Sequence, residues 1–211
     1  MIQIYKRLKK MREKYIDTLA KLYDYATTVY SKKTYTQWYD TKVGSYTYTS
    51  FKNECDGLSK VLTQYGIGAG DKVAILSTNM PNWSVAFFST VVFGRISIPI
   101  LPDSSENEVT NIINHSESKV LFVSKRLLSN VSKECIDKMT LVIDIETFEE
   151  IKRDDSKFTC DGKVSQPMPD DIATINYTSG TTSQPKGVML PSANISANID
   201  FALDNIPVEE G

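Results

Sequence analysis

The feature that most constrains the fold is an alternation, from Ser45 onward, of short β-branched runs with longer amphipathic runs, separated by Gly, Pro, Asn and Asp. Short apolar runs are typical of buried strands and longer amphipathic runs of helices, so the pattern predicts βαβ units. Parallel strands need crossover connections, and helices in these connections cover the sheet. The sequence therefore predicts an α/β fold, a mainly parallel sheet with helices on both faces. The predicted strands are 46–48, 72–77, 96–101, 119–124, 140–145 and 172–177.

Local signals mark where two of the predicted helices begin. Pro81 falls in the first turn of one helix, where its missing N–H costs no hydrogen bond. Ser105 and Glu108 fit a capping box, in which the hydroxyl accepts from a free helix N–H and the carboxylate reaches back. Residues 149–171 are polar and contain prolines, so we expect an irregular surface connection there. The predicted helices are 50–65, 81–93, 105–115 and 125–135.

Residues 1–44 are predicted to form an N-terminal helical segment that packs on the α/β part, residues 45–211. Apolar residues recur there at helical spacing, namely Ile4, Leu8, Met11, Tyr15, Leu19 and Leu22. The same stretch is basic, with Lys6, Arg7, Lys9, Lys10, Arg12 and Lys14. Basic amphipathic helices also bind anionic lipid, so a peripheral membrane contact stays open as the alternative. The sequence shows no evident transmembrane segment and no secretion signal.

Charge and cysteine content narrow the class of protein. The chain has 24 Lys and Arg against 26 Asp and Glu, a net charge of −2 that gives no overall reason to expect nucleic-acid binding. Its three cysteines, Cys55, Cys135 and Cys160, are far apart and lack the spacing of zinc or redox pairs. We expect reduced thiols and a cytoplasmic protein.

The most informative segment follows the last predicted strand, where residues 178–188 are almost all small, hydroxylic or basic. Gly180 permits backbone conformations closed to other residues, so successive N–H groups and hydroxyls can surround phosphate oxygens, and Lys186 adds a positive charge. Such clusters are also common in solvated turns. A Walker A loop is disfavoured because Lys186 precedes Gly187, whereas that motif places Lys after the glycine.

The string from Tyr177 to Val188 resembles the phosphate-binding signature of the adenylate-forming superfamily, which includes acyl-CoA synthetases, luciferases and nonribosomal peptide synthetase adenylation domains. The resemblance extends from about Tyr46 to Asn198, and residues 112–123 are most similar to long-chain fatty-acyl-CoA synthetases. This chain has Ser183 where the family usually has glycine, and Ser192 where it often has histidine.

The resemblance implies ATP-dependent carboxylate activation. The carboxylate of a small-molecule acid attacks the ATP α-phosphate, and a thiol such as coenzyme A then takes the acyl group. It also implies that Thr178 is a Mg²⁺ ligand, together with an acidic residue from a later part of the family's sequence, and it assigns no catalytic residue to this chain. The residues implied to hold the ATP phosphates are Thr178, Ser179, Gly180, Thr181, Thr182, Ser183 and Lys186.

The family's later motifs, its hinge and its C-terminal domain do not follow Gly211. We therefore expect residues 45–211 to be the N-terminal part of an AMP-binding domain, ending after the phosphate loop and its helix, and inactive alone. An incomplete sheet also exposes edges, which leaves a homodimer open. The alternatives are an amino-acid or aryl-acid adenylating domain, or a nucleotide-binding module without catalysis.

Other candidate residues are given structural roles. His115 is the single histidine, and without metal ligands near it in sequence we expect it to be structural. Asp170 and Asp171 are expected to be solvated charges at the entrance of the last strand, without a catalytic role. An aromatic group at helical spacing is expected to pack in the core rather than to line an acyl pocket, and comprises Trp83, Phe87, Phe88 and Phe93.

Overall fold

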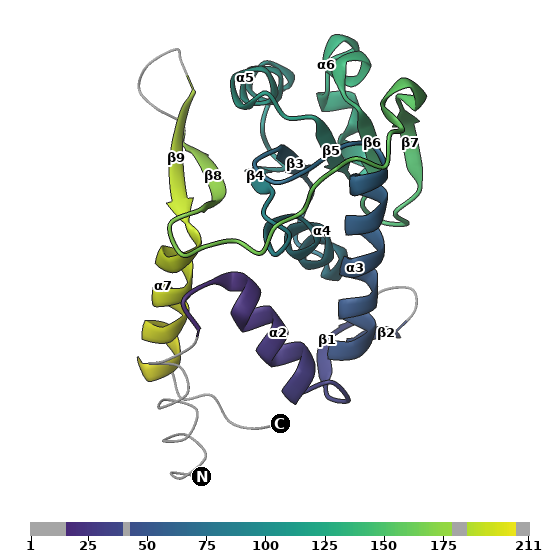
Figure 1. Cartoon of the computed structure of the whole chain (residues 1–211). Coiled ribbons are helices and arrows are strands. Elements are labelled where there is room, and N and C mark those ends of the chain that lie inside the picture. The colour runs from purple at the N-terminus through teal and green to yellow at the C-terminus, as the bar shows by residue number, and fades with distance from the viewer. Residues whose placement is uncertain (1–15, 40–42, 179–184, 206–211) are drawn as a thin grey trace.

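The main sheet confirms the predicted α/β class. The computed structural model of the chain describes residues 16–39, 43–178 and 185–205. Its seven-stranded sheet has the order β7-β6-β5-β3-β4-β8-β9 (Figure 1). The five inner strands are parallel, and the two edge strands pair antiparallel with their neighbours. The strands are β3 (Lys72–Leu76), β4 (Ile96–Ile100), β5 (Val120–Val123), β6 (Leu141–Asp144), β7 (Glu150–Arg153), β8 (Ile172–Thr178) and β9 (Lys186–Pro191).

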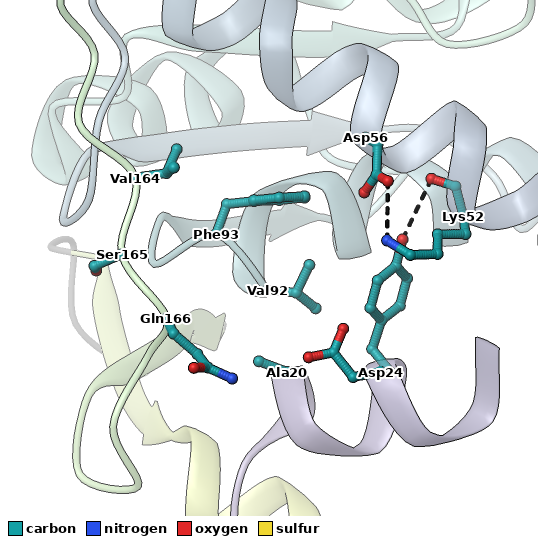
Figure 2. A pocket seen from close by; sticks show the side chains of 10 residues that line it. Ala20, Asp24, Lys52, Asp56, Val92, Phe93, Val164, Ser165 and Gln166 are labelled. Carbon is teal, nitrogen blue, oxygen red and sulfur yellow. Dashed lines mark hydrogen bonds and ion pairs between the residues drawn. The ribbon is translucent and has the colours of Figure 1, made fainter. Parts of the chain in front are cut away.

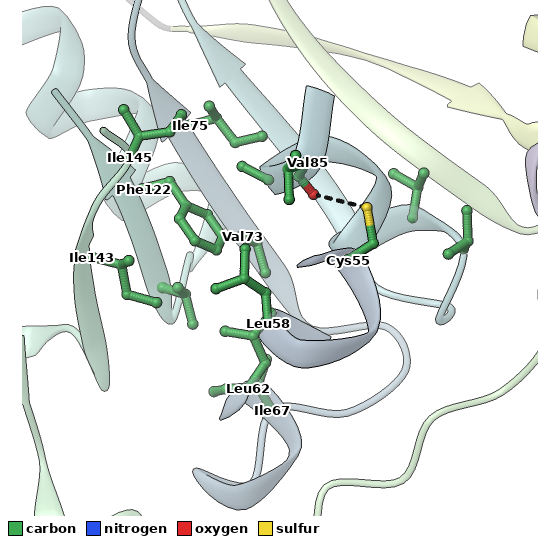
Figure 3. Packing of buried hydrophobic residues seen from close by; sticks show 14 of the residues in the cluster. Cys55, Leu58, Leu62, Ile67, Val73, Ile75, Val85, Phe122, Ile143 and Ile145 are labelled. Atoms are coloured by element: carbon green, nitrogen blue, oxygen red, sulfur yellow. Dashed lines mark hydrogen bonds between the residues drawn. The ribbon is translucent and has the colours of Figure 1, made fainter. Parts of the chain in front are cut away.

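Helices cover both faces of this sheet, as predicted. Side chains of β3 alternate between two buried clusters, with Val73 and Ile75 in one and Ala74 and Leu76 in the other. The first cluster is closed by α2 (Leu19–Val29), α3 (Tyr48–Gln64) and α4 (Pro81–Val91), and the second by α5 (Glu106–Ser116) and α6 (Lys133–Lys138). Helix α7 (Ser192–Asn205) adds two apolar side chains to the first cluster. Figure 3 shows how α3 packs against the strands in this cluster.

The aromatic residues of α4 are partly buried and pack against the first buried cluster, in agreement with the expected core packing. The rings of Trp83 and Phe87 stack at 5.3 Å, and Phe88 stacks on Tyr23 of α2 at 5.8 Å. Cys55 is buried below them, and burial raises the pKa of its thiol to about 12. Its thiol donates to the Val85 carbonyl, a contact drawn in Figure 3. The three cysteines are free, as expected of reduced thiols.

Several predicted elements differ from the structure. The helix expected at 125–135 is a 3-10 turn, η1 (Lys125–Asn130), followed by α6, because the Ser132 hydroxyl caps a new helix start. The connection expected at 149–171 contains strand β7, which carries charged side chains on its exposed edge. Strand β8 lies where predicted but is buried only at Ala173 and Thr174.

The N-terminal segment is only partly helical within the described residues. Helix α2 buries Leu19 and packs Leu22 against the core, as the spacing predicts. Strand β1 (Thr34–Tyr39) follows and pairs antiparallel with β2 (Val43–Thr47), so the segment predicted as helical over 1–44 also contains strands. Residues 1–15, which carry the basic stretch, lie outside the described residues. None of the described helices is long and apolar enough to cross a membrane.

Arg95 begins the turn into β4 and is completely buried. Within the described residues no carboxylate forms an ion pair with it, and every N–H of its guanidinium donates to neutral oxygens. The acceptors are the carbonyls of Ser59, Ile67 and Ser89 and the hydroxyls of Ser59 and Thr63, at 2.8–3.3 Å. Burial lowers the pKa of Arg95 to about 10, so the side chain stays protonated. This one side chain joins the end of α3, the loop before β3 and the end of α4.

We expect Arg95→Met to destabilise the fold by about 3–5 kcal/mol, because it leaves several buried acceptors without donors. The measurement is the free energy of unfolding in urea, followed by circular dichroism. Arg153→Met is the matched control, since Arg153 lies on exposed β7 in surface ion pairs that contribute about 1 kcal/mol or less. Equal losses in the two variants would contradict this account of Arg95.

Candidate functional site

The candidate phosphate loop connects two antiparallel strands. Thr178, the last residue of β8, pairs directly with Lys186, the first residue of β9, and both side chains are exposed. The structure therefore brings together the two described members of the predicted site. The other predicted members, Ser179, Gly180, Thr181, Thr182 and Ser183, lie outside the described residues. Sequence reasoning missed β9, although the apolar run Val188–Leu190 was a signal for it.

Strands β8 and β9 form the outer hairpin of the sheet. Strand β8 runs parallel to β4, with Ser97 opposite Thr174, and its pairing with β9 continues to Thr178 and Lys186. Figure 1 shows β8 and β9 rising from one side of the sheet. Thr178 and Lys186 thus lie at the carboxyl end of β8, the end at which parallel sheets bind ligands.

Gly187 is required for the packing of this hairpin. A Cβ at this position would lie 2.6 Å from Cγ2 of Ile175 and 3.3 Å from Cζ of Tyr177. Both side chains therefore lie over Gly187, and Tyr177 is its direct partner across the strands. The neighbouring Lys186 takes its position from this contact. A side chain at 187 would displace the strand that carries the lysine.

His115 contacts the hairpin from α5. Its Nδ1 lies 2.8 Å from the hydroxyl oxygen of Tyr177, and the two rings are nearly perpendicular with centroids 5.6 Å apart. Burial raises the pKa of Tyr177, so its hydroxyl stays protonated at neutral pH. In the part of the chain that the structure describes, no group of three His, Cys, Asp or Glu residues could hold a metal.

Ser192 anchors the other end of the hairpin. It is 1% exposed, its N–H donates to the Asp171 carbonyl, and its hydroxyl accepts from the N–H of Leu19 at 2.9 Å. The serine thus joins the start of α7 to the start of α2, a contact that the sequence did not indicate. Asp170 and Asp171 are exposed, and the Asp171 carboxylate accepts from the Met168 N–H. Both match their expected role as solvated charges at the strand entrance.

A pocket of about 310 Å³ lies elsewhere, between α2, α3, the end of α4 and residues 164–166 (Figure 2). At the rim of the pocket, the Lys52 ammonium donates to the Asp56 carboxylate. The backbone carbonyl of Lys52 accepts from the Tyr23 hydroxyl. Asp24 also faces the space. Carboxylates at the rim disfavour a phosphate, whereas the exposed hydroxyl of Thr178 and ammonium of Lys186 suit one. The hairpin is therefore the better candidate site.

Fold and loop define a class: an α/β protein with a mainly parallel sheet and a Ser/Thr/Gly-rich segment at the carboxyl end of a strand. Within this class, the chain belongs to the AMP-binding enzyme family, whose model matches residues 24–209. The match spans the helices, the sheet and the hairpin, so it does not depend on the loop alone.

Proteins that are similar to this chain in sequence include several acyl-CoA synthetases. Long chain acyl-CoA synthetase 2 of Arabidopsis thaliana is 27% identical over 76% of this chain and 27% of its own length. The peroxisomal long chain acyl-CoA synthetase 6 of the same plant is 30% identical over 76% of this chain and 26% of its own length. Fatty acyl-CoA synthetase A of Dictyostelium discoideum is 24% identical, again over 76% of this chain. The chain thus spans about a quarter of the length of these relatives.

Solved structures share the fold. The fatty acyl-adenylate ligase of L. pneumophila, in complex with acyl adenylate and pyrophosphate, aligns with a TM-score of 0.69 at 20% identity, over 87% of this chain and 32% of its own. A long-chain-fatty-acid-CoA ligase of Archaeoglobus fulgidus gives 0.68 at 23% identity, over 90% and 40%. An anthranilate CoA ligase gives 0.71 at 19% identity, over 88% and 36%. At these identities the likeness establishes the fold.

We expect Ser192→Ala to cost about 1–3 kcal/mol of unfolding free energy, because the buried N–H of Leu19 loses its acceptor. Urea unfolding measures the loss, and hydrogen exchange at the Leu19 amide should accelerate with it. Ser129→Ala is the control, since Ser129 is an exposed serine whose removal leaves no buried donor. An unchanged exchange rate at Leu19 would show that Ser192 does not anchor α2.

Proposed function

We propose that this chain provides the ATP-phosphate site of an enzyme that activates carboxylic acids as adenylates. The observation that carries the proposal is the direct pairing of Thr178 with Lys186, which puts a hydroxyl and an ammonium at the two ends of a short Ser/Thr/Gly-rich segment. Membership of the AMP-binding enzyme family supports ATP as the nucleotide. Charge-assisted hydrogen bonds to phosphate are strong, so two such groups in fixed positions favour a polyphosphate.

In this proposal the loop residues bind the β- and γ-phosphates. Lys186 supplies the positive charge, and Ser179, Gly180, Thr181, Thr182 and Ser183 supply N–H groups and hydroxyls. These groups act electrostatically. Negative charge develops on the departing pyrophosphate, and fixed hydrogen-bond donors stabilise that charge without a protein nucleophile.

Thr178 is the proposed protein ligand of Mg²⁺. Its hydroxyl oxygen is a hard donor of the kind that Mg²⁺ prefers, and its side chain is exposed at the end of β8. One hydroxyl fits a Mg²⁺ ion that takes its other ligands from phosphate oxygens, water and a carboxylate elsewhere in the polypeptide. When bound, the ion would neutralise charge on the phosphates.

The reaction has two steps. A carboxylate oxygen of the acid attacks the α-phosphorus of ATP, the bond to the β-phosphate oxygen breaks, and pyrophosphate leaves. The sulfur of coenzyme A then attacks the acyl carbonyl of the adenylate, and AMP leaves. The names of the relatives, among them long chain acyl-CoA synthetases, favour a long-chain fatty acid as the substrate of the whole enzyme. We place it in the cytoplasm on the basis of the free thiols.

We expect the chain to bind Mg·ATP, and Lys186→Ala to weaken binding about 10- to 100-fold, since a hydrogen bond to a charged group contributes about 1.5–3 kcal/mol. Isothermal titration calorimetry measures the affinity. Lys133→Ala is the control, because Lys133 is an exposed lysine on α6. If both variants bound Mg·ATP as tightly as the unchanged chain does, the proposed site would be wrong.

The catalytic part of the proposal is tested by acid-dependent ATP–pyrophosphate exchange. Residues 1–211 alone should show no exchange, whereas a polypeptide extended to the length of the relatives should show it with long-chain fatty acids. Faster exchange with an amino acid or an aryl acid would favour the corresponding adenylating domain instead. Mg·ATP binding without exchange for any acid, even in the longer polypeptide, would favour a non-catalytic nucleotide-binding module.

A further inference from the structure

We infer that His115 is a positioning residue for Thr178 and Lys186, the two described residues of the proposed phosphate site. Through its hydrogen bond to Tyr177 it holds the hairpin in the geometry that presents Thr178 and Lys186 to phosphate. This inference rests on the proposed function of the loop. It adds to the proposed site a residue that is 62 positions from Tyr177 in the sequence. His115 acts through Tyr177, so it is not a catalytic residue.

Helix α5 contacts the hairpin next to its tip. Strand β8 lies between β4 and the edge strand β9, and its pairing with β9 continues to Thr178. Two strands alone are marginally stable, so an outer hairpin gains from contacts with other elements. Helix α5 provides such a contact at the Tyr177 hydroxyl, one residue before the pair of Thr178 with Lys186.

Tyr177 occupies a central position in the hairpin. Its hydroxyl contacts His115, its ring lies over Gly187, and it pairs directly with that glycine across the strands. The next pair outward is Thr178 with Lys186. A shift of the tyrosine ring would therefore move the strand that carries Lys186 and change the distance between the two phosphate-binding groups.

Helix α5 is a fixed support for the hairpin. A capping box formed by Ser105 and Glu108 holds its start, and its buried Val109 and Ile113 pack against the sheet. At its end Glu117 adopts a left-handed conformation, with φ of 54°, that terminates the helix just after His115. The imidazole is thus presented from the last turn of a well-anchored helix. Because His115 itself is exposed, its contact affects the position of the tip more than the stability of the fold.

A double-mutant cycle on Mg·ATP affinity tests the inference, using His115→Ala, Tyr177→Phe and the two together. Each single variant should bind about 5- to 10-fold more weakly, and the double variant should bind no more weakly than the singles, because both remove the same contact. His115→Asn should restore affinity to within about twofold, since its Oδ1 can take the place of Nδ1. Unchanged affinity in the singles, or additive losses in the double variant, would refute the inference.

Two further measurements separate positioning from a general loss of structure. The urea midpoint should stay unchanged in His115→Ala, and Asn114→Ala, an exposed neighbour on the same helix, should bind Mg·ATP normally. A fall in affinity that simply followed a fall in stability, or an equal effect of Asn114→Ala, would refute a specific role of His115.

Hydrogen exchange distinguishes failure of this inference from failure of the proposed function. In the ATP-free chain, His115→Ala should accelerate exchange at the amides of residues 175–178 and 186–189 and leave Ile113 of α5 unchanged. If the unchanged chain failed to bind Mg·ATP, the proposed function would be wrong, and accelerated exchange would still uphold the contact as the support of the hairpin. Unchanged exchange would refute that support whether or not Mg·ATP binds.

Discussion

The parallel pairing of β3 with β4 on one side and β5 on the other is the constraint on which the rest of the structure depends. Parallel neighbours cannot be joined by tight turns, so each connection carries a helix across a face of the sheet. Both faces are then buried, which explains why β3 is apolar at successive positions. Arg95 stabilises this arrangement where three segments meet, since its guanidinium donates to the carbonyls of Ser59, Ile67 and Ser89.

The candidate site follows from an exception to the parallel pattern. Strand β8 joins the sheet in parallel beside β4, but β9 returns antiparallel along it, so β8 is followed by a hairpin partner instead of a crossover helix. A hairpin places its two ends side by side, which is how Thr178 and Lys186 come to be paired. The scaffold determines the position of these two groups, while the intervening residues supply the remaining donors of the proposed site.

The central elements could be predicted because their signals are local. Apolar runs such as 72–77, Pro81 at a helix start and the capping box of Ser105 each act within a few residues. Strand β9 has a weaker signal, the short apolar run Val188–Leu190, because Gly187 and Pro191 lower its intrinsic strand preference and its pairing with β8 compensates. The loop was visible because its chemistry lies in consecutive residues. The contact between His115 and Tyr177 was not, because it depends on how α5 lies against a hairpin distant in sequence.

Two hydrogen bonds hold the hairpin, one near its base and one near its tip. At its base, Ser192 binds the start of α2, and near its tip, Tyr177 binds the end of α5. These helices lie on opposite faces of the sheet, since α2 packs in the first buried cluster and α5 in the second. A hairpin fixed from both faces cannot tilt toward either without breaking one contact. The positions of Thr178 and Lys186 therefore depend on the whole domain and not on the hairpin sequence alone.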